Sequence, residues 1–408
     1  MTGDQFTSID RERLRIGYGV KWGFVPGDVL PSWVADMDFG TPPTVREAMA
    51  AVLERGDLGY AFWRGEDPVV EAFERRMATR YGWAPQSGRT KIFTDLIQVL
   101  QVMIEHSTKP GDGIAVHVPA YPPFLATIER SGRRIVPIPM IDVGGGWGFD
   151  GENLSSRLRA ENCRMLVLVN PQNPTGRVFS RNELEDLAGV ADELDLIVLA
   201  DEIHSDLTFE DHRHVPFASL GRGPASRTIT ATSATKAFNI AGMRCAVAHI
   251  GPTSVWDALE REPLDYFGQP SILSRVATVA AWNDSDAWLD QLKQVLAANR
   301  NTIKRWVNDL PDTILYYPPE ATYLSWFNFS HATGADRADP ATDLESRAKV
   351  KLSQGAEFSQ HTSIDSSGYA RLNFATSPAN LVDILERMRT AIGGASNPPA
   401  WSERKCVF

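Results

Sequence analysis

The sequence predicts an α/β protein: a large domain with a mostly parallel seven-stranded sheet and flanking helices, then a smaller α+β C-terminal domain. Two observations predict the large domain. Short apolar runs alternate with longer helical patterns, which is typical of strand–helix–strand units and a parallel sheet. The runs at residues 165–169 and 196–200 lack polar alternation, as expected for strands that are buried on both faces.

The elements of the large domain follow from these patterns. We expect strands at residues 91–93, 113–118, 134–138, 164–169, 196–200, 228–232 and 245–250. The helical patterns between them cover residues 96–106, 124–131 and 181–194. Ser180 and Glu183 form a capping-box pattern, which favours a helix that starts at Arg181.

The character of the chain changes near residue 285. A long helix is expected at 288–307, strands at 323–329, 347–354 and 370–374, and a last helix at 378–392. Residues 1–45 have little periodicity, so we expect an arm that packs on the small domain or on a partner subunit. The predicted division is therefore an arm at 1–45, a large domain at 46–284, a small domain at 285–393 and a tail at 394–408.

Composition excludes several classes of protein. Hydrophobic residues make up 43% and charged residues 23% of the 408 residues, the balance of an ordinary globular protein. The net charge of −10 argues against a global basic footprint for nucleic acid. Three scattered cysteines fit neither a disulfide scaffold nor a four-cysteine zinc site, and no metal is expected. Without a signal-like start or a long apolar run, we expect a cytoplasmic protein with no membrane partner.

Three polar residues follow three of the expected strands. Asn173 comes after 164–169, Asp201 after 196–200 and Lys236 after 228–232. Open α/β sheets bind ligands at the carboxyl ends of their strands. A buried amine favours Schiff-base chemistry, and a carboxylate beside it suits a cationic heteroaromatic cofactor that withdraws electrons. Each residue alone also fits a plainer role: Asn173 as a turn residue, Asp201 as a helix cap and Lys236 as a surface lysine.

These segments resemble the fold-type-I pyridoxal-phosphate enzymes, the aspartate aminotransferase superfamily. The chain keeps the order of the family's motifs over nearly its whole length: Asn-Pro-Thr-Gly at 173–176, Asp201, Ser-x-Thr-Lys at 233–236, Arg244 and Arg371. One branch is closer: the MalY/PatB group of cystathionine β-lyases, or cysteine C–S lyases. Three segments of this chain resemble that group, at residues 31–39, 119–124 and 201–204.

The resemblance implies pyridoxal 5′-phosphate as cofactor. Lys236 would bind its aldehyde covalently and then shuttle protons, and Asp201 would pair with the pyridine nitrogen. Asn173 and His204 would contact the phenolic oxygen, although His204 also fits a helix cap or a core histidine. Tyr121 would stack on the ring as part of the catalytic machinery. Arg371, with Asn173, would bind the substrate carboxylate.

The phosphate of the cofactor would contact Ser233, Thr235, Arg244, the helix start at Leu96 and Ile97, and Tyr60 from a neighbouring subunit. Tyr60 also fits a packed interface tyrosine. One departure from the family concerns Asp95, which stands where a small residue is usual. Its carboxylate near an anion is unfavourable unless it points away, but N–H groups at a helix N-terminus still bind phosphate.

The implied function is that of a C–S β-lyase, which cleaves a cysteine S-conjugate or cystathionine to a thiol, pyruvate and ammonia. Aminotransfer uses the same residues, and decarboxylation-coupled deamination of a cysteine adduct stays open. A relative that has lost catalysis is disfavoured by the intact Lys236, Asp201 and Arg244. The resemblance also implies a homodimer with shared sites. The aromatic residues that could line the pocket or belong to the core are Trp33, Phe39, Phe62, Trp63 and Tyr323.

Overall fold

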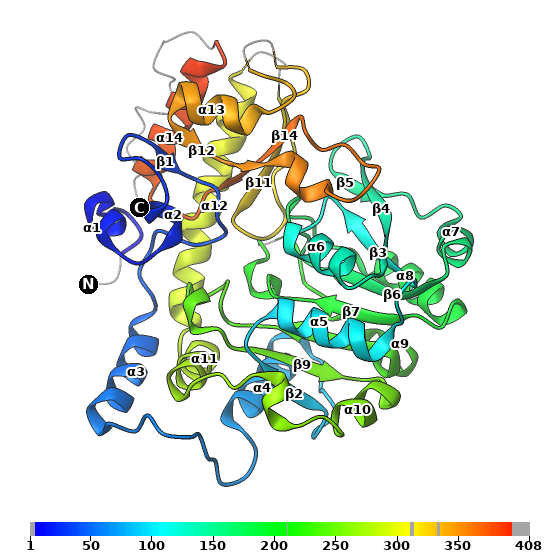
Figure 1. Cartoon of the computed structure of the whole chain (residues 1–408). Helices are drawn as coiled ribbons and strands as arrows, with labels where there is room; N and C mark the ends of the chain where they lie inside the picture. The colour runs from blue at the N-terminus through cyan, green and yellow to red at the C-terminus, as the bar shows by residue number, and fades with distance from the viewer. Residues whose placement is uncertain (1–4, 210, 311–313, 333–334, 394–408) are drawn as a thin grey trace.

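Figure 1 shows the computed structural model, in which residues 5–209, 211–310, 314–332 and 335–393 are described. The predicted tail at 394–408 lies outside the described residues. A large sheet with its helices forms one part of the molecule, and a small sheet with its own helices forms the other. None of the described helices combines the length and the apolar character that crossing a bilayer requires.

The large sheet confirms the predicted α/β class. Its order is β2-β9-β8-β7-β6-β3-β4-β5, and the neighbours from β8 to β4 are parallel. β9 is antiparallel to β2 and β8, and β5 is antiparallel to β4. All seven expected strands are present, and β5 adds an eighth. The bounds are β2 Thr90–Phe93, β3 Gly113–Val118, β4 Arg134–Asp142, β5 Trp147–Phe149, β6 Cys163–Val169, β7 Ile197–Asp201, β8 Thr228–Thr232 and β9 Ala246–Ile250.

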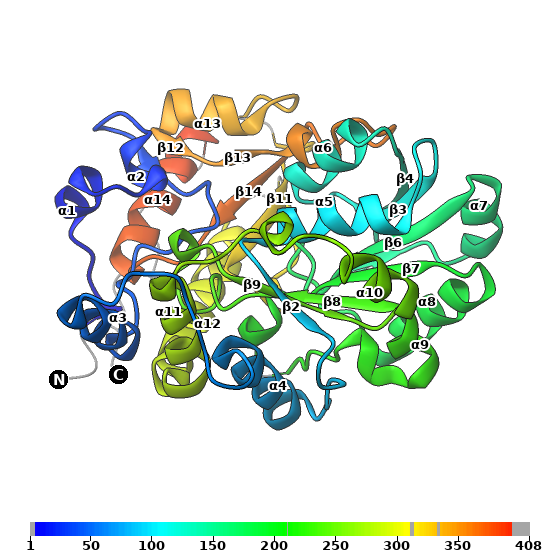
Figure 2. The ribbon, with the colours of Figure 1, turned by 60° about the horizontal axis from the view of Figure 1, so that its bottom comes forward.

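Helices cover both faces of this sheet (Figure 2). One face packs against α5 (Leu96–Ser107), α6 (Pro122–Arg130) and α10 (Thr253–Leu259). The other packs against α7 (Leu154–Ala160) and α8 (Arg181–Glu193). The predicted capping box is present, since Ser180 and Glu183 each bond to the other's backbone N–H. The other α-helices described in this part are α3 Pro43–Arg55, α4 Pro68–Tyr81, α9 Arg222–Arg227 and α11 Ile272–Asp284.

The small sheet has the order β10-β11-β14-β13 and is antiparallel. The expected strand at 347–354 is wrong in part: residues 347–348 end helix α13, and Lys349 has a φ of 56°. This left-handed residue ends the helix and separates it from two short strands. The bounds are α12 Asp286–Asn308, β10 Leu315–Tyr316, β11 Leu324–Asn328, α13 Pro340–Ala348, β12 Val350–Lys351, β13 Ser353–Gln354, β14 Tyr369–Asn373 and α14 Pro378–Ala391.

The N-terminal segment packs on the small sheet's part of the molecule. It contains α1 (Arg11–Ile16), α2 (Val20–Gly23) and β1 (Leu30–Pro31), and β1 pairs with β12 in parallel. Trp22 and Phe39 are buried in the same apolar cluster as residues of α12 and α14. The segment therefore covers its own chain and brings residues 32–39 to the edge of the large sheet.

Candidate active site

The carboxyl ends of β6, β7 and β8 meet at a cavity of about 120 Å³, which we name the strand-end cavity. Because these three strands are neighbours, the residues that follow them come together, as predicted. The cavity also receives the start of α5, the start of α6 and one residue of the N-terminal segment. Its lining consists of Ala35, Asp95, Leu96, Ile97, Tyr121, Phe124, Val169, Asn173, Asp201, Ile203, His204, Thr235, Lys236 and Ala241.

Lys236 projects its amine into this cavity. Its Nζ donates a hydrogen bond to the carbonyl oxygen of Ala35 at 2.8 Å. Burial lowers the pKa of Lys236 to about 8, because desolvation disfavours the charged ammonium, although Asp36 opposes this. The amine is therefore more readily deprotonated than an exposed lysine, the state in which it can attack a carbonyl carbon.

Asp201 ends β7 and is the buried acid of the cavity. Its Oδ1 accepts a hydrogen bond from the backbone N–H of Ile203 at 3.0 Å. Burial raises the pKa of Asp201 to about 7, despite that bond and the nearby Lys236. A carboxylate in this position gains stability from any cationic ring nitrogen placed beside it.

His204 is buried and neutral. Burial, with the nearby cations of Lys236 and Arg371, lowers the pKa of His204 to about 3. It precedes the 3₁₀ helix Ser205–Leu207 but makes no side-chain cap bond, so the helix-cap alternative is not supported. Its Nδ1 has no hydrogen-bond partner among the described residues. The imidazole can therefore bond to a group held in the cavity.

Arg371 lies on β14, beside the cavity, and contacts Asn173. Its Nη1 donates to Oδ1 of Asn173 at 2.9 Å, and its Nη2 donates to the carbonyl of Trp33 at 2.9 Å and to Oγ of Ser353 at 3.1 Å. Its Nε has no partner in the described part of the chain. Burial lowers the pKa of Arg371 to about 10, which still leaves the guanidinium charged at neutral pH.

Only some of the residues expected to contact the phosphate line the strand-end cavity. Leu96 and Ile97 open α5, and N–H groups in a first helical turn have no carbonyl partner within the helix. Thr235 also lines the cavity. Ser233 does not, since its Oγ donates to the carbonyl of Cys245 at 2.6 Å and bonds to Thr235 Oγ1 at 3.0 Å.

Asp95 and Arg244 form a close ion pair at the N-terminus of α5. Asp95 also caps α5 by accepting a bond from the N–H of Gln98 at 2.8 Å. Asp95 lines the cavity, and Arg244 compensates the charge of its carboxylate. Arg244 is mostly exposed, so its guanidinium is accessible to a second anion.

The two tyrosines differ in position. Tyr121 precedes α6 and lines the cavity, and burial raises the pKa of its hydroxyl, which stays protonated at neutral pH. Tyr60 lies in the connection between α3 and α4, a segment that Figure 1 traces. Its side chain is fully exposed. It does not reach the cavity of its own chain.

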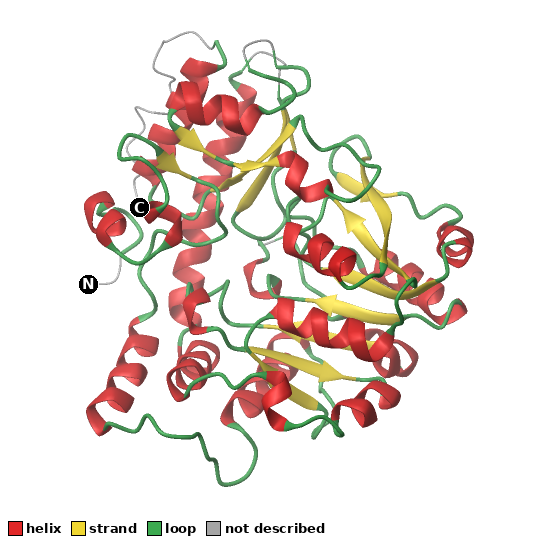
Figure 3. Cartoon of the chain, in the orientation of Figure 1, coloured by secondary structure: helices red, strands yellow, loops and turns green. Residues whose placement is uncertain are grey.

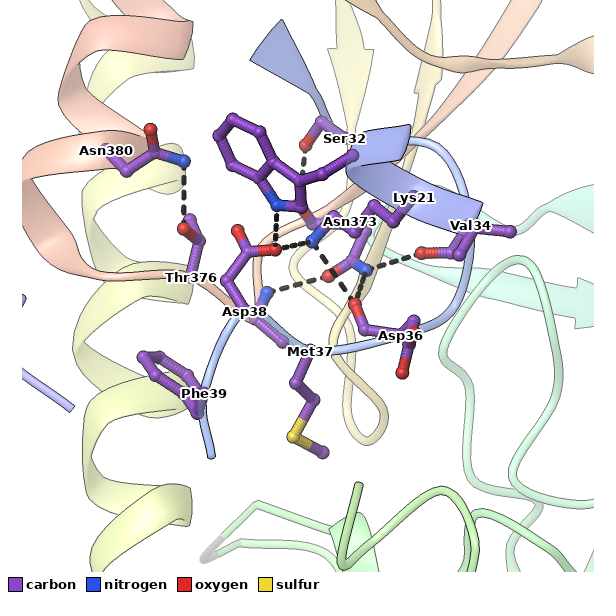
Figure 4. Close-up of polar contacts among 12 residues, drawn as sticks. Lys21, Ser32, Val34, Asp36, Met37, Asp38, Phe39, Asn373, Thr376 and Asn380 are labelled. Carbon is purple, nitrogen blue, oxygen red and sulfur yellow. Dashed lines mark hydrogen bonds and ion pairs between the residues drawn. The ribbon is translucent and has the colours of Figure 1, made fainter. Parts of the chain in front are cut away.

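Sequence reasoning missed the backbone of the N-terminal segment as a part of the site. The carbonyl of Ala35 accepts both the Lys236 bond and one from the hydroxyl of Tyr323 at 3.0 Å. Figure 4 shows what holds this segment: Nδ2 of Asn373 donates to the carbonyls of Val34 and Asp36, both at 2.6 Å. A backbone acceptor has no signature in the sequence. Of the other aromatic candidates, Phe39 is core and Phe62 is exposed.

Comparisons with known proteins agree with this geometry. A sequence model of the family "Aminotransferase class I and II" matches residues 34–388. Cystathionine beta-lyase PatB of Bacillus subtilis is 32% identical, over 94% of this chain and 100% of that protein. Protein MalY of Escherichia coli is 30% identical, over 86% of this chain and 88% of its own length.

Solved structures give the same result. The crystal structure of OvoB has a TM-score of 0.87 and 31% identity, and the match covers 96% of this chain and 99% of that one. Cystalysin from Treponema denticola, which contains a pyridoxal 5′-phosphate cofactor, has a TM-score of 0.88 and 26% identity, with 96% and 99% covered. The chain therefore belongs to the aminotransferase class I and II family of fold-type-I pyridoxal-phosphate enzymes, within the PatB/MalY C–S lyase group, and its cofactor is pyridoxal 5′-phosphate.

Proposed function

We propose that this enzyme is a C–S β-lyase that cleaves a cysteine S-conjugate or cystathionine to a thiol, pyruvate and ammonia. The observation that carries the proposal is the buried amine of Lys236, which shares one cavity with the carboxyl of Asp201. The similarity to proteins named cystathionine beta-lyase, at 32–34% identity, supports this reaction over others of the family.

The residues present fit the cofactor. Lys236 would hold its aldehyde carbon. Asp201, a buried acid without a hydrogen-bonded cation among the described residues, would keep the pyridine nitrogen protonated. The unpartnered Nδ1 of His204 and the amide of Asn173 would bond to the phenolic oxygen. The ring would lie against Tyr121.

The phosphate of the cofactor would lie at the start of α5. Leu96 and Ile97, whose N–H groups belong to the first turn of α5, and Thr235 all line the cavity. Arg244, which forms an ion pair with Asp95, would also contribute its positive charge to binding the phosphate. Ser233 would act indirectly, through its bond to Thr235.

Once bound, the cofactor withdraws electrons from the substrate's Cα and so makes the Cα proton removable. The neutral amine of Lys236 would take that proton. The guanidinium of Arg371 would bind the α-carboxylate and thereby orient the Cα–H bond toward the amine. The proton that Asp201 keeps on the pyridine nitrogen would stabilise the negative charge that develops when Cα loses its proton. The β-sulfur would then leave.

We also propose a homodimer with shared sites. The connection between α3 and α4 and the end of α3 expose the apolar side chains of Leu53, Leu58, Tyr60 and Phe62. A twofold interface would cover these side chains twice and would bring each Tyr60 toward the partner's cofactor phosphate.

The reaction is tested with the loaded enzyme, L-cystathionine and a panel of S-alkyl and S-aryl cysteines, measuring pyruvate and free thiol. Equal amounts of thiol and pyruvate are expected. A second arm supplies an amino acid and 2-oxoglutarate, because aminotransfer would yield glutamate without thiol. Carbon dioxide release from a cysteine adduct would instead indicate the decarboxylating reaction. Either of these outcomes without thiol and pyruvate would overturn the lyase proposal.

A further inference from the structure

A second cavity, of about 430 Å³, lies away from the strand-end cavity and shares no lining residue with it. It is open to solvent on one side and is bordered by the last turn of α4, the first residue of α8 and the segment that follows β7. We name it the arginine cavity. Its lining consists of Arg80, Tyr81, Arg181, Ser205, Thr208, His212, Arg213, His214, Val215, Pro216 and Ser219.

The charge of this lining is one-sided. Three arginines contribute to it, and no described residue of the lining is Asp or Glu. The hydroxyl of Thr208 adds a further donor, whereas that of Ser219 already donates to the carbonyl of Pro216 at 2.6 Å. In a protein with a net charge of −10, such a concentration of cations in a concave site favours a compact anion. We propose that the arginine cavity binds a small oxyanion with two or more negative charges, such as a phosphate ester or a polycarboxylate.

The arginines are not all neutralised by the protein itself. Arg213 is exposed and forms no hydrogen bond or ion pair with any described residue. Arg181 has one pair, to Glu185 at 3.3 Å, and both of these side chains are about half exposed. Two guanidinium groups at one cavity can each offer a fork of N–H donors to an oxyanion.

The inner part of the cavity contains contacts between polar side chains. Nε of Arg80 lies 3.0 Å from Oδ1 of Asp206, and that same oxygen accepts a bond from the hydroxyl of Tyr81 at 2.6 Å. Nε2 of His214 lies 3.1 Å from Oε2 of Glu202, and both side chains are buried. These contacts fix the inner wall, so the site is largely formed before a ligand arrives.

The experiment titrates the cofactor-loaded enzyme with pyrophosphate and, separately, with citrate by calorimetry, at constant ionic strength set with chloride. The visible absorbance of the bound cofactor is recorded in the same samples. Saturable binding of one anion with unchanged absorbance is expected, and the preferred anion identifies phosphate or carboxylate chemistry. The double variant Arg181→Gln/Arg213→Gln should weaken it by about tenfold or more.

The matched control is Arg164→Gln, because Arg164 is an exposed arginine on β6 without a described partner. This control should bind as the parent does. Three results would overturn the proposal: no binding of either anion, equal weakening in the control, or loss of cofactor absorbance during the titration, which would place the anion at the cofactor's own phosphate site. The proposal does not depend on which reaction the enzyme catalyses.

Discussion

The Nζ of Lys21 lies 2.8 Å from Oδ1 of Asp38, and the two side chains are only 3% and 1% exposed (Figure 4). The same oxygen of Asp38 accepts a bond from Nε1 of Trp22 at 2.6 Å, and Lys21 also donates to the carbonyl of Asp36 at 3.2 Å. This pair therefore ties helix α2 to the segment that carries Ala35, the acceptor of the Lys236 bond.

Asp38→Ala should destabilise the protein by about 3–5 kcal/mol, because it leaves the charge of Lys21 buried without a partner. The measurement is chemical unfolding of the cofactor-loaded enzyme. Glu161→Ala is the matched control, since it breaks a half-exposed pair with Arg134 and should cost about 0–1 kcal/mol. The double variant Lys21→Met/Asp38→Leu should recover most of the loss. Equal effects of the Asp38 and Glu161 variants would contradict this account.

Cofactor loading of the cofactor-free enzyme should accelerate as the pH rises, up to about pH 8. The pKa of Lys236 is lowered to about 8, and only the neutral amine attacks the aldehyde. Below that pH the rate should fall by about tenfold per pH unit, as the neutral fraction does. Stopped-flow absorbance measures this rate.

Asp36→Asn provides the control for this pH dependence. Asp36 raises the pKa of Lys236, so its neutralisation should move the plateau to a lower pH. Lys236→Ala should form no covalent adduct at any pH and should lose several orders of magnitude in turnover. A loading rate that still rises near pH 10 would show that the amine titrates as an ordinary lysine.

Asp201→Asn should abolish most turnover and yet stabilise the cofactor-free protein at pH 8. The pKa of Asp201 is about 7 in the folded chain against an ordinary 3.8, so the folded state holds one more proton between these values. The free energy of unfolding therefore falls as pH rises through this window. Because asparagine cannot ionise, the substitution should raise the free energy of unfolding by at most about 4 kcal/mol at pH 8 and should leave it unchanged below about pH 4.

Asp206→Asn should behave in the opposite way. Burial raises the pKa of Asp206, but Arg76 and Arg80 more than offset this and hold it below its usual value. Its ionised form therefore stabilises the fold at neutral pH, and its neutralisation should lower the unfolding midpoint. If both variants changed the midpoint in the same direction at pH 8, the electrostatic account of Asp201 would fail.

Arg371→Lys should lower kcat/KM by about 100-fold, because a point charge replaces the planar fork that would bind the substrate carboxylate. Ser353→Ala is its control, since it leaves the guanidinium in place and removes the 3.1 Å contact to Nη2 together with the 2.8 Å bond from Ser353 Oγ to the carbonyl of Trp33. It should cost less than about tenfold. Steady-state kinetics with one cysteine conjugate measures both. Similar losses in the two variants would indicate that Arg371 matters only for the packing of β14.

Sequence patterns predicted what local chemistry determines. Buried strands show as unbroken apolar runs, and the polar residues that follow them converge because parallel neighbours end at one edge. β5 was missed because Trp147–Phe149 has three residues, one of them glycine, and no alternation to detect. The carbonyl of Ala35 was missed because long-range packing positions it, through Lys21, Asp38 and Asn373.

The last prediction concerns Tyr60, which is fully exposed on its own chain. If it completes the partner's phosphate site, inactive Lys236→Ala chains and impaired Tyr60→Ala chains should restore activity to each other after subunit exchange. In the mixed dimer one site collects both lesions and the other collects neither. Activity should return to at most about half of the sites in each mixed dimer. Turnover before and after exchange measures the recovery.

The control for complementation mixes Lys236→Ala with Asp201→Asn, because both of these residues line the cavity of a single chain. Every site of that mixed dimer keeps one lesion, so no activity should return. Recovery in this control would mean that whole active chains form by some other route. Absence of recovery with Tyr60→Ala, despite exchange proven by mass spectrometry, would argue that Tyr60 only packs at the interface. A monomer by sedimentation with normal turnover would contradict the shared site altogether, since no second chain would then be there to supply it.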